Sequence, residues 1–239
     1  MNLEQYYSDD KNLRKILCSI EYPQWRVWKA LWPDGIFRQN RTPIRSVSDL
    51  KAFLCQEKLS PIKVYYSVGL FLNPQKVRGY RTGLNKYLVA DGMFLYSQLY
   101  FDFDSSDLEL ARKECLMVKD YMEDKPCFKL IKIQYSGSKG FNLVYEPIKR
   151  YNGKVSPYRR MKYYEEKRYH LVKKMVGELS LTTLNGEHLN VCSDQFRVMA
   201  ATWTIKGTSG NLVRPLSEAE ILKPYMPARL IKPITDSPL

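Results

Sequence analysis

The sequence predicts an α/β (α+β) fold in which a mixed sheet is flanked by helices. Strand-like and helical segments alternate along most of the 239 residues. Residues 100–104 alternate acidic and aromatic side chains at the period of a strand, and residues 108–122 then follow a helical spacing. Two more strand-like segments, residues 130–135 and 141–145, precede a helical stretch over residues 157–181. This order places a sheet in the centre, with helices on its faces.

The N-terminal part of the chain predicts a capped helix followed by a β-hairpin. Asp9 or Asp10 can cap a helix that continues to about residue 20, because Pro23 cannot extend it. Residues 25–32 carry tryptophans at a helical spacing, yet the turn-forming residues 33–35 and the apolar residues after them favour two joined strands. We expect the hairpin, with the tryptophans in the core.

The next stretch predicts a short helix, a strand and a basic loop. Ser46 or Ser48 can begin a helix over residues 50–54, and residues 64–68 have the composition of a strand. Residues 75–85 combine glycines with cations, and they suit either a contact with a phosphate backbone or a plain solvated loop. These cations are Lys76, Arg78 and Arg81.

The middle of the chain predicts a strand, a helix and a strand-turn-strand unit. After the acidic strand, Ser106 and Glu109 form a capping box for the helix over residues 108–122. The strand-like runs at residues 130–135 and 141–145 are joined by a glycine-rich turn.

The C-terminal third predicts one long helix and then extended segments. Residues 149–174 contain ten Lys or Arg against two Glu, and the helix expected over residues 157–181 carries most of them. Such a run is usually a solvated helix face, although its interleaved tyrosines can also stack on bases. Further on, residues 198–205 predict an extended segment and residues 206–210 a tight basic turn.

The composition is that of a globular protein with an excess of positive charge. The chain has 38 Lys and Arg against 25 Asp and Glu, a net charge of +13, which favours nucleic acid as a partner. Ribosome-associated and membrane-surface proteins share this balance. No apolar run approaches the ~20 residues that span a bilayer and no secretory signal is visible, so we expect a cytoplasmic protein without a membrane partner. Five singly scattered cysteines predict buried free thiols.

Asp102 and Asp104 form the most informative pair of side chains. Two residues apart on a strand, they point to one face about 7 Å apart, where a hard divalent cation can bridge them. Two acids on an exposed strand face are the alternative. The flanking residues 94–95 and 99–103 have the composition of a buried core, however, where two carboxylates without a cation are costly. We therefore expect Mg²⁺ or Mn²⁺ at this pair.

Two further segments carry compatible chemistry. The turn over residues 136–140 offers backbone N–H groups and the Lys139 ammonium, which suit triphosphate oxygens. The stretch from Asp194 to Lys206 adds a third acid and two cations. Together with the aspartate pair, these groups describe a centre that polymerises nucleotides. The turn alone is weak evidence, because such turns are common in hairpins, and Asp194 alone would be expected to pair with Arg197.

In this order and spacing, the segments resemble the archaeo-eukaryotic primase superfamily. The resemblance is closest to the catalytic small subunit of archaeal-type DNA primase and to plasmid or viral primase-polymerases, and it runs from about Trp25 to Gly210. Residues 101–104 match the family's Asp-x-Asp motif, and residues 136–142 are similar to its Ser-Gly-x-Arg-Gly-x-His motif. The other similar segments are residues 65–68, residues 73–74, residues 194–197, where an acid stands three residues before an arginine, and residues 204–210.

The resemblance implies a catalytic core over residues 1–215 and a proline-containing tail or linker over residues 216–239. It implies template-directed primer synthesis, in which a 3′-hydroxyl attacks a nucleoside triphosphate on a single-stranded DNA template. It also implies a large primase subunit or a replicative helicase as a partner. Asp102, Asp104 and Asp194 would hold two Mg²⁺ or Mn²⁺ ions. The implied nucleotide contacts are Ser136, Gly137, Ser138, Lys139, Gly140, Asn142, Arg197 and Lys206.

Three positions depart from the family pattern. Asn142 and Lys206 each stand where the family has a histidine, and Ala200 replaces an arginine. The cysteine-rich zinc knuckle of many archaeal small subunits is not visible. One alternative is therefore a non-catalytic, nucleic-acid-binding, primase-like subunit. Another is a nuclease or other two-metal phosphoryl enzyme, for which three aspartates would serve equally well.

Overall fold

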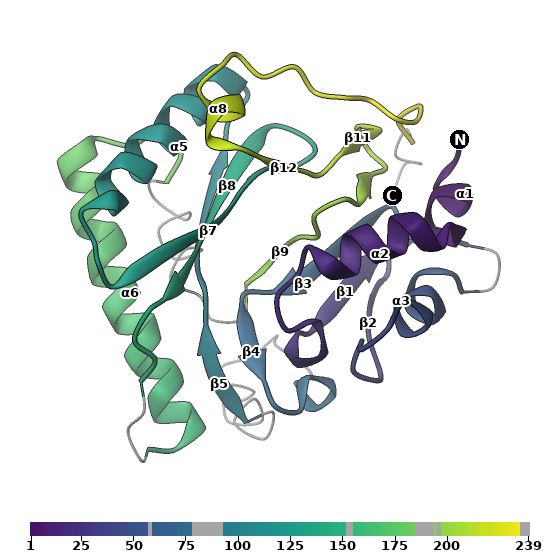
Figure 1. Ribbon diagram of the computed structural model, residues 1–239, viewed down its shortest axis with the longest axis horizontal. Coiled ribbons are helices and arrows are strands. Elements are labelled where there is room, and N and C mark those ends of the chain that lie inside the picture. The colour runs from purple at the N-terminus through teal and green to yellow at the C-terminus, as the bar shows by residue number, and fades with distance from the viewer. Residues whose placement is uncertain (57–58, 78–92, 152–154, 185–193, 195–196, 235–239) are drawn as a thin grey trace.

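Two four-stranded sheets form the centre of the molecule (Figure 1). The computed structural model describes residues 1–239 except 57–58, 78–92, 152–154, 185–193, 195–196 and 235–239. The first sheet, which we call the N-terminal sheet, has the order β2 (Phe37–Gln39), β1 (Trp28–Leu31), β3 (Lys63–Ser67) and β9 (Val198–Ala200). The second, the carboxylate sheet, has the order β12 (Arg214–Leu216), β7 (Phe128–Tyr135), β8 (Gly140–Pro147) and β6 (Leu99–Asp104). The predicted α+β class is confirmed.

Three short helices pack against the N-terminal sheet (Figure 1). They are α1 (Leu3–Ser8), α2 (Asp10–Cys18) and α3 (Val47–Leu54). Asp9 caps α2 as predicted, its carboxylate accepting from the Lys11 backbone N–H at 2.8 Å, whereas α1 was not expected. The predicted hairpin is also confirmed, because β1 and β2 pair in antiparallel register and bury Trp28 between the sheet and the helices.

Two long helices cover the outer face of the carboxylate sheet: α5 (Leu108–Glu123) and α6 (Pro157–Leu179). Leu99, Phe101 and Phe103 of β6 point into the apolar core beneath them, as the two-residue period of a strand requires. The helix predicted from Ser106 begins one residue later. Asp107 caps it, since its carboxylate accepts from the backbone N–H groups of the first turn, and the expected Ser106 capping box is wrong.

All pairs among the described strands are antiparallel, where we expected a mixed sheet. The reason is the position of β8. The chain leaves β6, crosses through α5 and returns in β7, but β8 then turns back and occupies the place between them. The two strands that run in the same direction are therefore not neighbours. Two smaller pairs complete the sheets, β4 (Gly69–Phe71) with β5 (Phe94–Ser97) and β10 (Ile205–Lys206) with β11 (Asn211–Leu212).

The segment predicted as extended over residues 198–205 is broken in the middle. It forms β9 and β10, separated at Trp203, whose φ of 63° is left-handed. The tight turn predicted after Lys206 is confirmed, because Gly210 at φ 72° closes the β10-β11 hairpin.

The chain after residue 215 returns to the core. Leu216 lies in β12, which pairs with β7, and α8 (Glu218–Ile221) follows. Tyr225 contacts Tyr135 in a tilted arrangement with the ring centroids 4.7 Å apart, and Ile231 is buried against the N-terminal sheet. Most of the backbone from residue 222 to residue 234 is irregular, as the prolines predicted, and most of its side chains are exposed, but Tyr225 and Ile231 attach it to the core.

Other expectations have simple outcomes. In the described part of the chain, no helix is both long and apolar enough to cross a membrane. Cys18, Cys55, Cys115 and Cys127 are free thiols as predicted, but the expected burial is found only at Cys115 among them, because Cys18 and Cys127 are exposed and Cys55 is half-buried. Cys192 lies outside the described residues. Most of the basic loop expected at residues 75–85, with Arg78 and Arg81, also lies outside them, and its described beginning forms a single 3₁₀ turn at Pro74–Lys76.

Candidate functional site

Asp102 and Asp104 point to the inner face of the carboxylate sheet, away from α5 and α6. Strand register sets their neighbours, because Asp102 is paired with Asn142 and Asp104 with Gly140 on β8. Asn142 Nδ2 donates to Asp102 Oδ1 at 2.6 Å, and Arg197 NH2 lies 3.5 Å from Asp102 Oδ2. The sequence prediction that both acids share one face is therefore met by the geometry.

The environment of Asp102 opposes its negative charge. Burial raises the pKa of Asp102, and the negative charge of Asp104 raises it further. The Arg197 guanidinium and hydrogen bonds from Asn142 and Tyr100 act in the opposite direction without cancelling the rise. A buried carboxylate pair in this condition gains from an additional positive charge.

Two tyrosines border the acids. Tyr100 lies two residues before Asp102 on the same face of β6, and burial followed by the Asp102 charge raises the pKa of Tyr100 well above its usual range. Burial and the Asp102 charge likewise raise the pKa of Tyr65 on β3 to about 12. Both phenols therefore remain neutral hydrogen-bonding groups beside the carboxylates at physiological pH.

The turn between β7 and β8 packs on the turn after β10. The Ser209 hydroxyl donates to the Gly137 carbonyl, and a Cβ added at Gly137 would come within 3.1 Å of Lys206 Cβ. Gly140 lies still closer to the acids, because a Cβ there would overlap the Phe103 carbonyl and the Asp104 carboxylate. The glycines of this turn thus let two backbone segments approach the aspartate pair.

Lys206 brings positive charge to the acids. Burial lowers the pKa of Lys206, and the charges of Lys63 and Lys139 lower it further, while Asp104 and Asp102 act against the fall. Lys63, Lys139, Asp102 and Asp104 therefore all lie close enough to Lys206 for their charges to shift its pKa. Lys139 is exposed, whereas Lys206 is half-buried. A small cavity lined by Lys63, Tyr65 and Lys206 lies beside them.

The remaining turn residues have distinct environments. Ser136 is buried, and its hydroxyl has no hydrogen-bond partner among the described residues. The Ser138 carbonyl accepts from the Tyr135 hydroxyl at 2.6 Å, which orients the turn. Arg197 Nε is also buried without a partner in the described part of the molecule. These polar atoms at the site are candidates for contact with a ligand.

Asp194 is not grouped with the other two aspartates. Among the residues that the structure describes, no three His, Cys, Asp or Glu side chains come close enough to hold a metal ion. The Asp194 backbone carbonyl accepts from the Arg197 N–H at 3.3 Å. Burial lowers the pKa of Lys29 of β1, and the negative charge of the Asp194 side chain opposes this fall. The structure therefore brings together Asp102, Asp104, Asn142, Arg197, Lys206 and the turn, but it does not bring Asp194 into the pair.

Several neighbours of the acids were missed from the sequence. They are Tyr65, Lys63 and Tyr100, together with the half-buried Lys132 and the buried polar residues Gln134 and Thr202 behind them. The two-residue period of a strand could have indicated some of them, because it places Tyr100 on the same face as Asp102, and Lys63 on the same face as Tyr65. Which strand lies opposite is a tertiary property and has no local signal.

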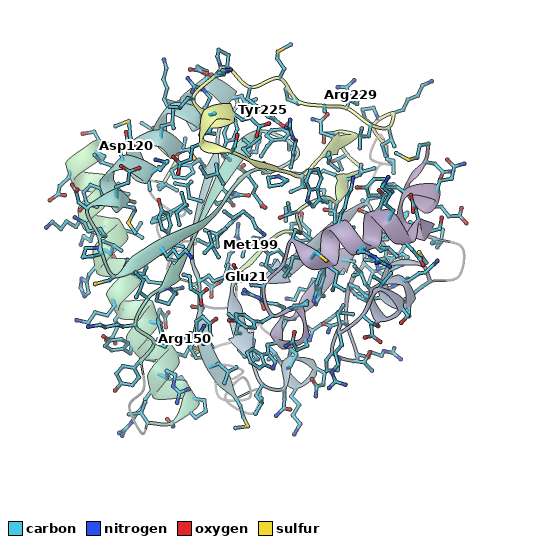
Figure 2. The ribbon with its side chains drawn as sticks, viewed as in Figure 1. Glu21, Asp120, Arg150, Met199, Tyr225 and Arg229 are labelled. Carbon is cyan, nitrogen blue, oxygen red and sulfur yellow. The ribbon has the colours of Figure 1, made fainter. Side chains whose placement is uncertain are left out.

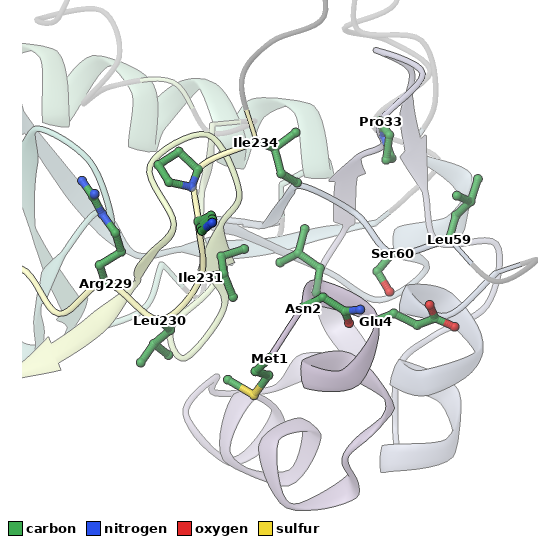
Figure 3. Close-up of a pocket in the computed structure, with 13 residues that line it drawn as sticks. Met1, Asn2, Glu4, Pro33, Leu59, Ser60, Arg229, Leu230, Ile231 and Ile234 are labelled. Carbon is green, nitrogen blue, oxygen red and sulfur yellow. The ribbon is translucent and has the colours of Figure 1, made fainter.

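A larger cavity of about 840 Å³ lies where the N-terminus meets the chain near residue 230 (Figure 3). Met1, Pro33 and Ile231 contribute to its walls, and none of the acids of the candidate site does. Figure 2 shows the side chains of the whole molecule, with Met199 of β9 between the two sheets and Asp120 of α5 on the outer side. The chemistry therefore centres on the two sheets and not on the larger cavity.

These observations define an α+β fold with a carboxylate pair and cations on the inner face of one sheet. The fold is similar to that of a solved structure, the polymerase domain of Ligase D from Mycobacterium tuberculosis in complex with DNA. The likeness has a TM-score of 0.60 at 13% sequence identity, and it covers 94% of this chain and 83% of that one. No family model matches the sequence, and no curated protein does.

Proposed function

We propose that this protein is a DNA-directed primase or polymerase that joins nucleoside triphosphates on a DNA template by two-metal nucleotidyl transfer. The observation that carries the proposal is the convergence of Asp102 and Asp104 with Lys206 and Arg197 on one face of the sheet. The likeness to a polymerase domain solved with DNA supports it, as does the net charge of +13.

The residues at the site fit a divalent cation. Carboxylate oxygens are the ligands that Mg²⁺ and Mn²⁺ prefer, and Asp102 and Asp104 present theirs on one strand face, where burial of Asp102 and the charge of Asp104 raise the pKa of Asp102. Asp102 and Asp104 would hold the metal. Asp194, the proposed third ligand, lies outside this pair in the structure and would have to approach it to bind the same ion. When bound, the metal would lower the pKa of the attacking 3′-hydroxyl and offset the charge of the pyrophosphate.

The other residues of the site have roles that follow from their charge and position. Lys206 and Lys139 are placed to bind the triphosphate and to stabilise the negative charge that develops on its departing oxygens. The buried Ser136 hydroxyl supplies a donor at the same turn. Arg197, 3.5 Å from Asp102 Oδ2, balances the carboxylate before the metal and nucleotide arrive.

The test is Asp102→Ala in a primer-synthesis and extension assay with Mg²⁺ or Mn²⁺. We expect incorporation to be lost while the circular dichroism spectrum and melting temperature show an intact fold. Asp120→Ala is the matched control, because Asp120 is an exposed aspartate on α5, on the outer side of the sheet (Figure 2). Primer formation that persists in Asp102→Ala would refute the metal assignment. Degradation of a labelled substrate instead of its extension would favour the nuclease alternative.

A second candidate function is favoured by one observation at Asn142. Its two amide hydrogens are already engaged, one by Asp102 Oδ1 at 2.6 Å and the other by the Phe141 carbonyl at 3.0 Å. Asn142 therefore has no donor left for a triphosphate, unlike the histidine that the family has there. A non-catalytic subunit that binds nucleic acid would not need one. Manganese-dependent incorporation by the unmodified protein separates the two functions.

A further inference from the structure

A line of hydrogen bonds leads from Asp102 into the interior. Asn142 Nδ2 donates to Asp102 Oδ1 at 2.6 Å, and Gln134 Nε2 donates to Asn142 Oδ1 at 3.0 Å. Thr202 Oγ1 donates to Gln134 Oε1 at 2.9 Å, and Lys132 Nζ donates to Thr202 Oγ1 at 3.0 Å. Asn142, Gln134 and Thr202 are each 0% exposed. One buried chain thus joins a lysine to the candidate metal ligand.

The direction of each bond follows from the cationic end. An ammonium group can only donate, so Thr202 must accept from Lys132 and give its single hydrogen to Gln134. Gln134 then presents its carbonyl oxygen to Thr202 and its NH₂ group to Asn142. Asn142 must in turn present its own NH₂ group to Asp102. The Asn142 amide is therefore oriented from both ends, by the acceptor oxygens of Asp102 and Phe141 on one side and by the donor chain from Lys132 on the other.

The remaining donors of the chain are also engaged. Lys132 Nζ donates to the Ser19 carbonyl at 2.7 Å and to the Tyr66 hydroxyl at 3.1 Å. Gln134 Nε2 donates to the Ala200 carbonyl at 3.1 Å. A network in which each donor has its acceptor resists rearrangement, because a flipped amide would set two acceptors against each other in a buried site.

We propose that Lys132, Gln134 and Thr202 are positioning residues for the metal site, an inference that rests on the proposed function. Their chain holds the Asn142 amide with its donor toward Asp102 Oδ1. The carboxylate is thereby fixed with Oδ2 on the side of Arg197, whose NH2 lies 3.5 Å away. Oδ2 is then the oxygen that would bind the metal ion. Without the chain, Asn142 Oδ1 loses its buried donor, and the amide is no longer held in the position from which it fixes the carboxylate that must bind the metal.

The test compares Thr202→Val with Thr202→Ser. Valine removes the hydroxyl at nearly constant volume, whereas serine keeps it. We expect Mn²⁺ affinity, measured without nucleotide by electron paramagnetic resonance, to fall about tenfold or more in Thr202→Val, as is typical when the support of a ligand is lost. Thr202→Ser should stay within about twofold of the unmodified protein. Hydrogen exchange of the Asn142 and Gln134 side-chain amides, followed by NMR, should accelerate only in Thr202→Val.

Thr183→Val is the matched control. Thr183 is a buried threonine whose hydroxyl donates to Glu114 of α5, so its loss also removes a buried hydrogen bond, but at the outer face of the sheet. This variant should lose stability and keep its Mn²⁺ affinity. Lys132→Met interrupts the chain at its other end, and it serves as the second variant where Thr202→Val does not fold.

The outcomes separate the two proposals. Unchanged Mn²⁺ affinity and unchanged amide exchange in Thr202→Val would overturn the positioning role. If the unmodified protein binds Mn²⁺ but incorporates no nucleotide, the proposed function fails, and the positioning role is still judged by affinity. If the unmodified protein binds no Mn²⁺, the metal assignment fails as well, and the exchange of the Asn142 and Gln134 amides alone decides whether Thr202 orients them.

Discussion

Gly140 shows how a single residue sets the geometry beside the acids. It faces Asp104 across the β6-β8 ladder, and there is no room for a side chain between the two strands. A hydrogen in place of a methyl group is therefore a packing requirement here. The glycine of the turn motif has a structural reason that is independent of any contact with a nucleotide.

We expect Gly140→Ala to destabilise the protein by about 1–3 kcal/mol, because overpacking forces the two strands apart. Gly177→Ala is the control. A Cβ at Gly177, in α6, meets nothing within 4 Å, so alanine should stabilise the helix by roughly 0.5–1 kcal/mol. Urea unfolding of both variants gives the two free energies. A Gly140→Ala protein as stable as the unmodified one would show that β6 and β8 separate without cost.

The individual acids were predictable because their evidence is local. The spacing of Asp102 and Asp104 and the apolar residues between them are enough to place both on one face of a strand. The partners of Asp102 were not predictable in the same way. Asn142 and Arg197 meet it only through the strand register and through the course of the chain before β9, and neither leaves a trace in the local sequence.

At the scale of elements, Glu114 joins α5 to the segment that follows α6. Its carboxylate accepts from the backbone N–H groups of Thr182 and Thr183, both at 2.8 Å, and from both hydroxyls. Burial raises the pKa of Glu114, but these four hydrogen bonds outweigh burial and leave the pKa below its usual value. The charged form of Glu114 therefore stabilises the fold.

We expect Glu114→Gln to destabilise the protein by about 2 kcal/mol at pH 7, because an amide cannot accept all four hydrogen bonds. The folded-state pKa lies below the unfolded one, so the stabilisation is present above the unfolded pKa and is lost as pH falls through the folded pKa. The difference between the two proteins should therefore shrink below about pH 4. Denaturant unfolding at several pH values measures it.

Glu166→Gln, on the exposed side of α6, is the control and should change stability by less than about 0.5 kcal/mol. A Glu114→Gln difference that stays constant with pH would contradict the role given to the carboxylate.

The start of α5 shows why helix boundaries are harder to predict than helices. The helix over residues 108–122 follows from apolar spacing, whereas its true cap, Asp107, competes with Ser106 for one position.

At the scale of the whole molecule, the α+β class was predictable because strand and helix periods alternate clearly. The arrangement of the strands was not. The sequence indicates a hairpin of β7 and β8, but the place of β8 between β6 and β7 depends on long-range pairing. The C-terminal segment is a similar case, because its prolines indicate irregular backbone and say nothing about docking.

The C-terminal segment contacts both halves of the molecule. Ile221 and Tyr225 pack on the core of the carboxylate sheet, and the backbone N–H of Leu230 donates to the Gly210 carbonyl at 2.9 Å. Tyr225 also contacts Phe141 edge-to-face, with the ring centroids 5.6 Å apart, directly after the turn that faces the acids. These contacts attach parts of residues 216–234 to the core, and the prediction of a proline-containing tail or linker from residue 216 remains to be tested.

The double variant Ile221→Ala with Tyr225→Ala tests this integration. Ile221 is 0% exposed and Tyr225 is half-buried, so their truncation should cost at least about 3 kcal/mol through lost burial and new cavities. The control is Leu222→Ala with Met226→Ala, because these neighbours are 66% and 86% exposed and should change stability by less than about 1 kcal/mol. Equal urea midpoints for the two double variants would show that the segment after residue 215 is a linker. A lower midpoint for the first alone would show that the residues after 215 contribute to the stability of the fold.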